Sequence, residues 1–188
     1  MRRLSWFRVA WDRCCRPYSQ GGLGLKDIGL LNDSLLRKFT WKFMTSDGFA
    51  FSFLRERNLK HLQKPHKGYV TSSIWSSLRS NYSSLLKEGI WLIGKKSQRD
   101  FWRDNWLGVP ILDLLGIPDY LANPLRARVL NFIHQGRCVL DDCFRARFPD
   151  LCFWIDRIAI SPVVDSLVWA NSQDGRVSCK AAYSQFFS

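Results

Sequence analysis

The side chains that could bind a ligand are densest between Gly89 and Gly108, where cations and indoles alternate. Lys and Arg supply affinity for phosphate that does not depend on base sequence, and exposed aromatic rings can stack on unpaired bases. The stretch therefore suits a polyanion with stackable bases, although it also suits an ordinary structural hairpin. Its cations are Lys95, Lys96, Arg99 and Arg103, and its indoles are Trp91, Trp102 and Trp106.

Catalytic chemistry has a weaker basis in this stretch. Two-metal nucleases and polymerases need converging carboxylates to hold their ions, and Asp100 and Asp104 would share one face of a strand. However, Arg99 and Arg103 stand beside them in the sequence and could neutralise them. We therefore expect no catalytic residue and no enzymatic activity.

The cysteines and histidines do not form a recognisable metal-binding pattern. His134, Cys138, Cys143 and Cys152 follow one another without the Cys-x-x-Cys knuckle of zinc sites. We interpret the thiols as small apolar groups, and as reduced, because the six cysteines are sparse and lack a disulfide spacing. The sequence thus predicts no metal, no cofactor and an intracellular location.

Amphipathic helices are expected to position many of these side chains. Apolar residues recur at helical spacing between Asp27 and Thr45. Similar patterns span residues 49–62, 72–86, 140–148 and 151–158, and another helix starts at residue 181. Residues 1–20 are expected to be extended. Three cations on the other faces of the 27–45 helix are candidate phosphate ligands, namely Arg37, Lys38 and Lys42.

Two β-hairpins are expected, over about residues 89–107 and 165–180. In the first, the apolar run 90–93 and the aromatic pair 101–102 flank a polar break that begins at Gly94. In the second, apolar runs flank a turn that contains Asp174-Gly175. The predicted fold class is therefore α+β, mainly helical with two β-hairpins, and the first hairpin would carry cations at its tip.

The net charge of +12 is distributed unevenly. Residues 1–108 contain 20 Lys and Arg against 8 Asp and Glu, whereas residues 109–188 contain eight of each. A domain of such charge attracts nucleic acid or another anionic surface. We expect a basic helical module over residues 1–108, loops and short helices over 109–164, and a hairpin with the start of a helix over 165–188. No apolar run is long enough for a membrane span.

Four motifs occur in a defined order: WDRCCRP before GGLGLKD within residues 5–27, NDSLLRKFTW at 32–41, WLIG with FWRDNWLG within 91–108, and Asp-Gly before Ala-Tyr within 165–183. This ordered set resembles plant non-LTR (LINE-type) retroelement polyproteins and the related ribonuclease H protein sequences. The resemblance implies the connection region between a reverse transcriptase and a zinc-binding segment. The polymerase aspartates are absent, and the zinc ligands and ribonuclease H carboxylates would lie beyond Ser188, so a fragment is expected. The family's Gly-Asn-Gly turn is replaced by Gly94-Lys95-Lys96.

From the residues and this resemblance we expect a non-catalytic module that binds RNA or single-stranded DNA non-specifically. The nucleus is a compatible location, and a reverse transcriptase domain acting in trans is a further expected partner. The alternative is a structural or protein-interaction scaffold, or an inactive retroelement relic, with the tryptophans packed on the 27–45 helix. The expected binding residues are Lys95, Lys96, Arg99, Arg103, Arg37, Lys38, Lys42 and Trp91.

Overall fold

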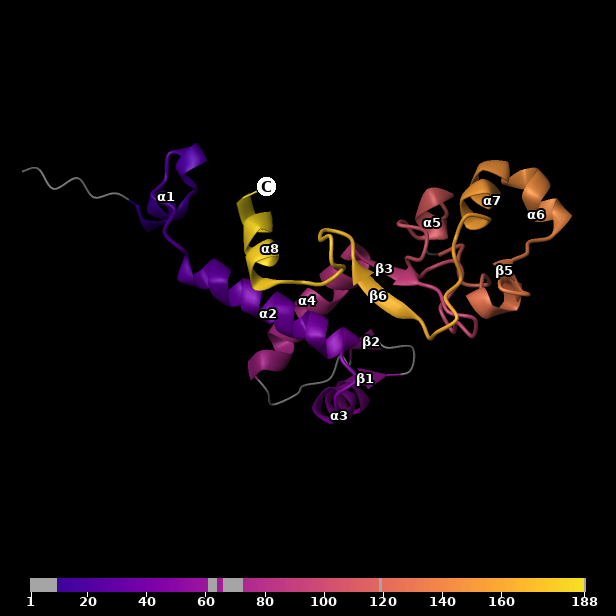
Figure 1. The fold of residues 1–188 in the computed structure, drawn as a ribbon, viewed down its shortest axis with the longest axis horizontal. Coiled ribbons are helices and arrows are strands. Elements are labelled where there is room, and N and C mark those ends of the chain that lie inside the picture. Colours follow the sequence, from indigo (N-terminus) through magenta and orange to yellow (C-terminus); the bar gives the residue numbers. More distant parts are fainter. Residues whose placement is uncertain (1–9, 61–63, 66–72, 119, 188) are drawn as a thin grey trace, which may run out of the picture. The chain divides into compact units, whose positions relative to one another are not determined.

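The computed structural model describes residues 10–60, 64–65, 73–118 and 120–187, which belong to two compact units (Figure 1). The first unit consists of residues 1–81 and 177–188, and the second of residues 82–176. These limits differ from the expected boundaries after residues 108 and 164, and residues 177–188 belong to the first unit. The start of the expected extended stretch 1–20, the end of the helical pattern 49–62 and the first residue of the pattern 72–86 lie outside the described residues.

The first unit is helical. Its long central helix α2 confirms the prediction for residues 27–45, since Asp27 caps it by accepting a hydrogen bond from the backbone N–H of Leu30 (3.0 Å). Residues 11–20, expected to be extended, instead form short helical turns. The elements of this unit are α1 (Trp11–Cys15), η1 (Tyr18–Gln20), α2 (Ile28–Thr45), α3 (Phe49–Asn58), β1 (Leu59–Lys60), β2 (Lys64–Pro65), α8 (Cys179–Ser184) and η4 (Gln185–Phe187).

Helix α8 packs on α2, so a C-terminal helix and a helix from the first quarter of the sequence lie side by side within the first unit (Figure 1). The Tyr183 hydroxyl accepts a hydrogen bond from the backbone N–H of Asp27 (2.9 Å), and Ala182 is fully buried. At the other end of α2, the Arg55 guanidinium donates to the carbonyls of Phe43 and Ser46 (2.8 and 2.6 Å). Both contacts tie α2 to its neighbours through backbone groups that its ends leave unsatisfied.

The second unit combines short helices with short strands. Helix α4 (Ser73–Glu88) crosses the boundary between the units, and the helices expected over residues 140–148 and 151–158 are present. The other elements are β3 (Gly89–Leu92), α5 (Ile111–Leu114), η3 (Val129–Phe132), β4 (Ile133–His134), β5 (Arg137–Cys138), α6 (Asp142–Arg147), α7 (Pro149–Ile155) and β6 (Ser166–Trp169).

Strands β3 and β6 pair with each other, one from each expected hairpin (Figure 1). Their antiparallel register places Gly89 opposite Trp169 and Leu92 opposite Ser166. The chain reverses direction within each of the two expected hairpin stretches. The backbone N–H of Trp91 donates to the carbonyl of Asn105, and the backbone N–H of Trp169 donates to the carbonyl of Gly175 (both 2.8 Å). The mainly helical α+β class is therefore confirmed, while the strand pairing runs between the two stretches.

The chain after Gly94 forms turns in place of a second strand. The Asp100 carboxylate accepts from the backbone N–H groups of Trp102 and Arg103 (both 2.9 Å), which closes a tight turn of the kind that Asp side chains favour. This turn directs Phe101 into the core, where it is fully buried against Trp106 and Phe132. Among the helices that the structure describes, none combines the length and apolar character needed to cross a membrane.

Candidate nucleic-acid interface

The basic tip, defined as residues 94–99, is held by one carboxylate from a distant part of the second unit. Asp165 accepts hydrogen bonds from the Gly94 backbone N–H (2.9 Å) and the Ser97 hydroxyl (3.1 Å). Its Oδ2 also lies 3.4 Å from the Nε of Arg99. Ser97 is buried, and its N–H closes a turn on the Gly94 carbonyl (3.1 Å). The tip is thus a defined conformation rather than a loose loop.

Lys95 and Lys96 project from this tip and are exposed. The backbone N–H of Lys95 is bonded to the carbonyl of Ser161 (3.1 Å), so the position of the chain at this point is fixed while the ammonium group remains in solvent. An exposed ammonium on a fixed backbone can meet a phosphate with little loss of backbone freedom. Both lysines are therefore exposed cations on an ordered stretch of backbone.

Trp91 and Arg99 form a pair inside the second unit. The guanidinium of Arg99 lies 3.6 Å from the centre of the Trp91 ring, a cation–π contact. Trp91 is only 8% exposed. Stacking on a base requires an accessible ring face, and Arg99 covers one face of this ring. The structure therefore places Trp91 in the core and Arg99 between it and Asp165.

Arg103 is directed inward. Its guanidinium donates to the carbonyls of Ala122 and Leu125 (2.6 and 2.8 Å) and lies 3.4 Å from Asp100. These bonds fasten the 120–128 segment to the Phe101 turn. The described contacts of Arg103 thus give it a structural role, with the guanidinium already engaged by backbone oxygens.

The carboxylates of Asp100 and Asp104 accept hydrogen bonds from backbone N–H groups. Asp104 accepts from the N–H of Asp100 (2.8 Å), and burial raises the pKa of Asp104, more than this hydrogen bond and the nearby Arg99 lower it. A carboxyl of this kind stabilises a turn. In the part of the chain that the structure describes, no group of three His, Cys, Asp or Glu side chains could hold a metal ion.

The cysteines remain apart from any reactive arrangement. Burial raises the pKa of Cys138 to about 11 and also raises the pKa of Cys152. A thiol with such a pKa stays protonated near neutral pH and is a poor nucleophile. Cys143 and His134, by contrast, are exposed. The thiols of Cys138 and Cys152 are therefore placed as the small buried groups that the sequence predicts.

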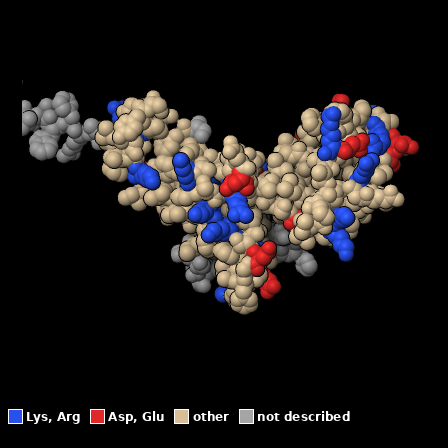
Figure 2. Space-filling model, in the orientation of Figure 1, with Lys and Arg blue, Asp and Glu red and all other residues tan. Residues whose placement is uncertain are grey.

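The predicted cations of the first unit differ in exposure. Lys42 is exposed on α2, Lys38 is half-buried, and Arg37 lies on the same stripe as the buried Ser34 and Trp41. In Figure 2, Lys and Arg gather over the part of this unit that α2 occupies in Figure 1. Other exposed cations among its described residues are Arg13, Arg16, Lys26, Arg57, Arg79 and Lys180.

The charge asymmetry is also present between the two units. The first unit carries 16 Lys and Arg against 5 Asp and Glu, and the second carries 12 against 11. Over α6 and α7, basic and acidic side chains are interspersed (Figure 2). The first unit therefore supplies nearly all the net charge, whereas the basic tip is a local feature of a nearly neutral unit.

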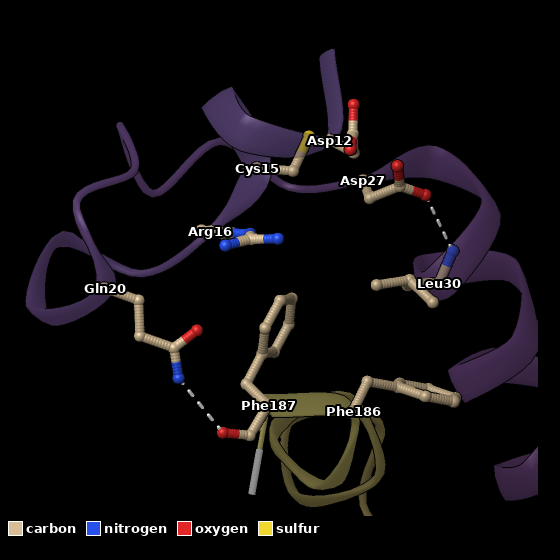
Figure 3. Close-up of a pocket in the computed structure, with 8 residues that line it drawn as sticks. All are labelled: Asp12, Cys15, Arg16, Gln20, Asp27, Leu30, Phe186 and Phe187. Carbon is tan, nitrogen blue, oxygen red and sulfur yellow. Dashed lines mark hydrogen bonds between the residues drawn. The ribbon is translucent and has the colours of Figure 1, made fainter. Parts of the chain in front are cut away.

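An open pocket of about 430 Å³ lies in the first unit between the N-terminal turns and the last helical turn (Figure 3). Gln20 donates to the carbonyl of Phe187 across one side of it (3.4 Å). The Arg16 guanidinium points into the opening, and Asp12 and Asp27 lie beyond it (Figure 3). Burial and the neighbouring Asp27 raise the pKa of Cys15, so this thiol is not activated.

Two contacts near the tip involve residues that the sequence does not mark as its partners. Asp165 is expected only as the first residue of the second hairpin, and Arg128 is not among the expected site residues. In the structure Arg128 is exposed and bonds the side chain of Gln98, while Asp165 clamps the tip. A local pattern could not reveal these contacts, because each joins residues about 30 or more positions apart.

Comparisons with known proteins give two relatives and no assignment to a family. The chain matches no protein-family model and no solved structure. It is similar to "Putative ribonuclease H protein At1g65750" of Arabidopsis thaliana, with 26% identity over 218 residues that cover 93% of this chain and 30% of that protein. It is also similar to "Uncharacterized mitochondrial protein AtMg00310" of the same plant, with 29% identity over 110 residues, 56% of this chain and 70% of that protein. The chain thus spans about a third of the first relative.

Proposed function

We propose that this chain is a retroelement-related, non-catalytic module that binds RNA or single-stranded DNA without sequence preference. In this proposal it is the connection region of a non-LTR reverse transcriptase polyprotein, as the ordered motifs indicate. The chain is similar to a protein named as a ribonuclease H protein and spans 30% of that protein. This similarity supports the proposal that the chain is part of a longer enzyme that acts on nucleic acid.

The observation that carries the proposal is the charge of the first unit, 16 basic against 5 acidic residues. Such an excess on one compact unit attracts polyanions and makes their binding depend on salt. The lysines of the basic tip add two exposed cations on a fixed backbone. Phosphate contact of this kind requires no base-specific hydrogen bond, which is consistent with non-specific binding.

The test is fluorescence anisotropy with a labelled single-stranded RNA over a series of salt concentrations. Each single-strand phosphate contact contributes about 0.7 to the slope of log affinity against log salt. We therefore expect Lys95→Ala/Lys96→Ala to reduce the slope by about 1.4, and Lys38→Ala/Lys42→Ala to have a similar effect. The double variant Arg137→Ala/Arg147→Ala removes two exposed cations of the second unit and is the matched control.

A folded protein that fails to bind RNA at low salt would contradict the proposal. So would lysine variants whose slopes equal that of the control. The proposed absence of catalysis is tested by incubating the purified chain with an RNA–DNA hybrid and Mg²⁺ or Mn²⁺. Cleavage of the hybrid that a mock preparation does not produce would show that the chain is a nuclease.

A structural scaffold is the second candidate, and the burial of Trp91 and Trp106 favours it. Within the second unit, Trp91 contacts Arg99 and Trp106 contacts Phe101. A scaffold would retain its fold and show no salt-dependent RNA binding. The anisotropy series, run beside circular dichroism, therefore separates the two candidates.

A further inference from the structure

Two exposed loops of opposite chemistry lie next to each other in the second unit. One is the basic tip with Lys95 and Lys96. The other is the apolar loop, defined as residues 162–164, in which Val163 is 66% and Val164 82% exposed. Pro162 is exposed as well. Consecutive exposed apolar residues on an ordered loop mark a contact surface more often than isolated ones do.

The two loops are joined by backbone contacts. Lys95 donates to the Ser161 carbonyl (3.1 Å), and the Ser161 N–H donates to Ile93 (2.8 Å). The N–H of Val163 bonds the Ser161 hydroxyl (3.2 Å), which shapes the apolar loop. Asp165 closes the arrangement on Gly94. Valines and lysines are thus presented together by one bonded framework.

Gly94 is the point of closest approach between the loops. A Cβ atom at this position would lie 2.2 Å from the carbonyl oxygen of Val163, so a side chain there would force the loops apart. The absence of a side chain lets the two backbones touch. The close approach brings the exposed valines beside the exposed lysines.

We propose that the apolar loop is the second half of the nucleic-acid surface, contacting the face of an unpaired base while Lys95 and Lys96 bind the flanking phosphates. The inference rests on the proposed function and adds a contribution to the binding affinity that does not depend on salt. Apolar side chains placed beside cations are used in this way by proteins that insert wedges between bases. Unpaired nucleotides expose base faces that a duplex hides in its stack, so a single strand fits this surface better than a duplex.

The experiment compares two pairs of valines in the full chain. Val163→Thr/Val164→Thr keeps the β-branched shape and adds hydroxyls, so the backbone framework should be preserved. Val109→Thr/Val139→Thr makes the same change at two other exposed valines of this unit and is the matched control. Affinity for labelled single-stranded RNA is measured at several salt concentrations, and thermal melting by circular dichroism confirms that each variant is folded.

We expect the Val163/Val164 variant to bind about fivefold more weakly, because an aliphatic contact with a base face contributes no more than the weakest aromatic stacking, with an unchanged salt slope. The lysine variant should show the opposite pattern, with a reduced slope. Affinity for a blunt RNA duplex should change less than affinity for the single strand.

Each failure has its own signature. If the wild-type chain does not bind RNA, the proposed function fails and this inference fails with it. If the wild type binds and the lysine variant lowers the slope, but the Val163/Val164 variant matches its control, only this inference is overturned. If that variant instead loses binding to phosphatidylserine vesicles and keeps its RNA affinity, the surface is a membrane contact and the inference is also overturned.

Discussion

Burying the carboxyl group of Asp104 in the second unit has a cost in free energy. Its oxygen accepts the N–H of Asp100 (2.8 Å), yet burial outweighs this bond and raises the pKa of Asp104 above the ordinary value of 3.8. A raised pKa means that the folded state favours the protonated form. The contribution of Asp104 to stability is therefore greatest below the ordinary pKa and is lost as pH rises through the folded pKa.

From this sign we predict that Asp104→Asn raises the free energy of unfolding at pH 7. The asparagine carbonyl can still accept the bond from Asp100, while the buried charge is removed. The gain should shrink as the pH is lowered through the raised pKa of Asp104, because the wild-type carboxyl is then protonated. Urea titrations from pH 3 to pH 8 measure the effect, and Asp113→Asn, which removes an exposed carboxylate, is the control. A gain that does not vary with pH would contradict the assignment.

Residue types alone predicted the exposure of some of these side chains and not the surroundings of others. Exposure of Lys95 and Lys96 could be expected, since a glycine-containing polar break forms turns and lysine favours solvent. The surroundings of Trp91 and Arg103 could not, because the same indole or guanidinium can face solvent or the core. Trp91 is positioned by its contact with Arg99, and Arg103 by its hydrogen bonds to the carbonyls of Ala122 and Leu125. These are tertiary contacts.

At the level of elements, the β3–β6 ladder can be tested by cross-linking. Ile90 and Val168 are paired directly in the register, and both are half-buried. Directly opposed positions on antiparallel strands lie within the range that a disulfide can span. We predict that Ile90→Cys/Val168→Cys forms a disulfide on mild oxidation, detected by peptide mass spectrometry.

The control for the ladder is a pair on the same two strands that is out of register. Ile90→Cys/Ser166→Cys serves this purpose, since Ser166 is paired with Leu92. The Ile90–Val168 pair should cross-link faster than Ile90–Ser166. The reverse order would contradict the register described above.

Helices were more predictable than strand partners for a physical reason. The periodicity of residues 27–45 and the cap at Asp27 are local, so the sequence predicts α2 to within a residue at each end. Strand pairing is not local, because β3 and β6 are joined across more than 70 residues. The small β4–β5 hairpin was also missed, since its turn uses Gln135 with φ of 50° followed by Gly136, an unusual residue pair for such a turn.

For the whole molecule, the first unit depends on residues from the far end of the chain. Helix α8 covers α2, and Tyr183 accepts the N–H at the start of that helix. We predict that removal of residues 177–188 increases hydrogen exchange in α2 by at least tenfold, because burial and this bond are lost together. Exchange in β3 and β6 should change little, since their ladder lies in the second unit.

A milder variant separates the bond from the burial. Tyr183→Phe removes only the acceptor for Asp27 and should destabilise the first unit by about 1 kcal/mol. Equal increases in exchange across both units after removal of residues 177–188 would contradict the division of the chain. Unchanged exchange in α2 would show that α8 does not stabilise it.

The return of α8 to α2 also sets the order in which the chain can mature during synthesis. Residues 1–81 leave the ribosome first, yet their unit acquires its last helix only after the whole second unit has been made. The β3–β6 ladder likewise waits for residue 169. Closing such long loops lowers the rate of folding, so the strongly basic residues 1–81 form an incomplete unit until residues 177–188 have been made. A polyanion near the ribosome, including the messenger itself, would meet this unit before its fold is complete.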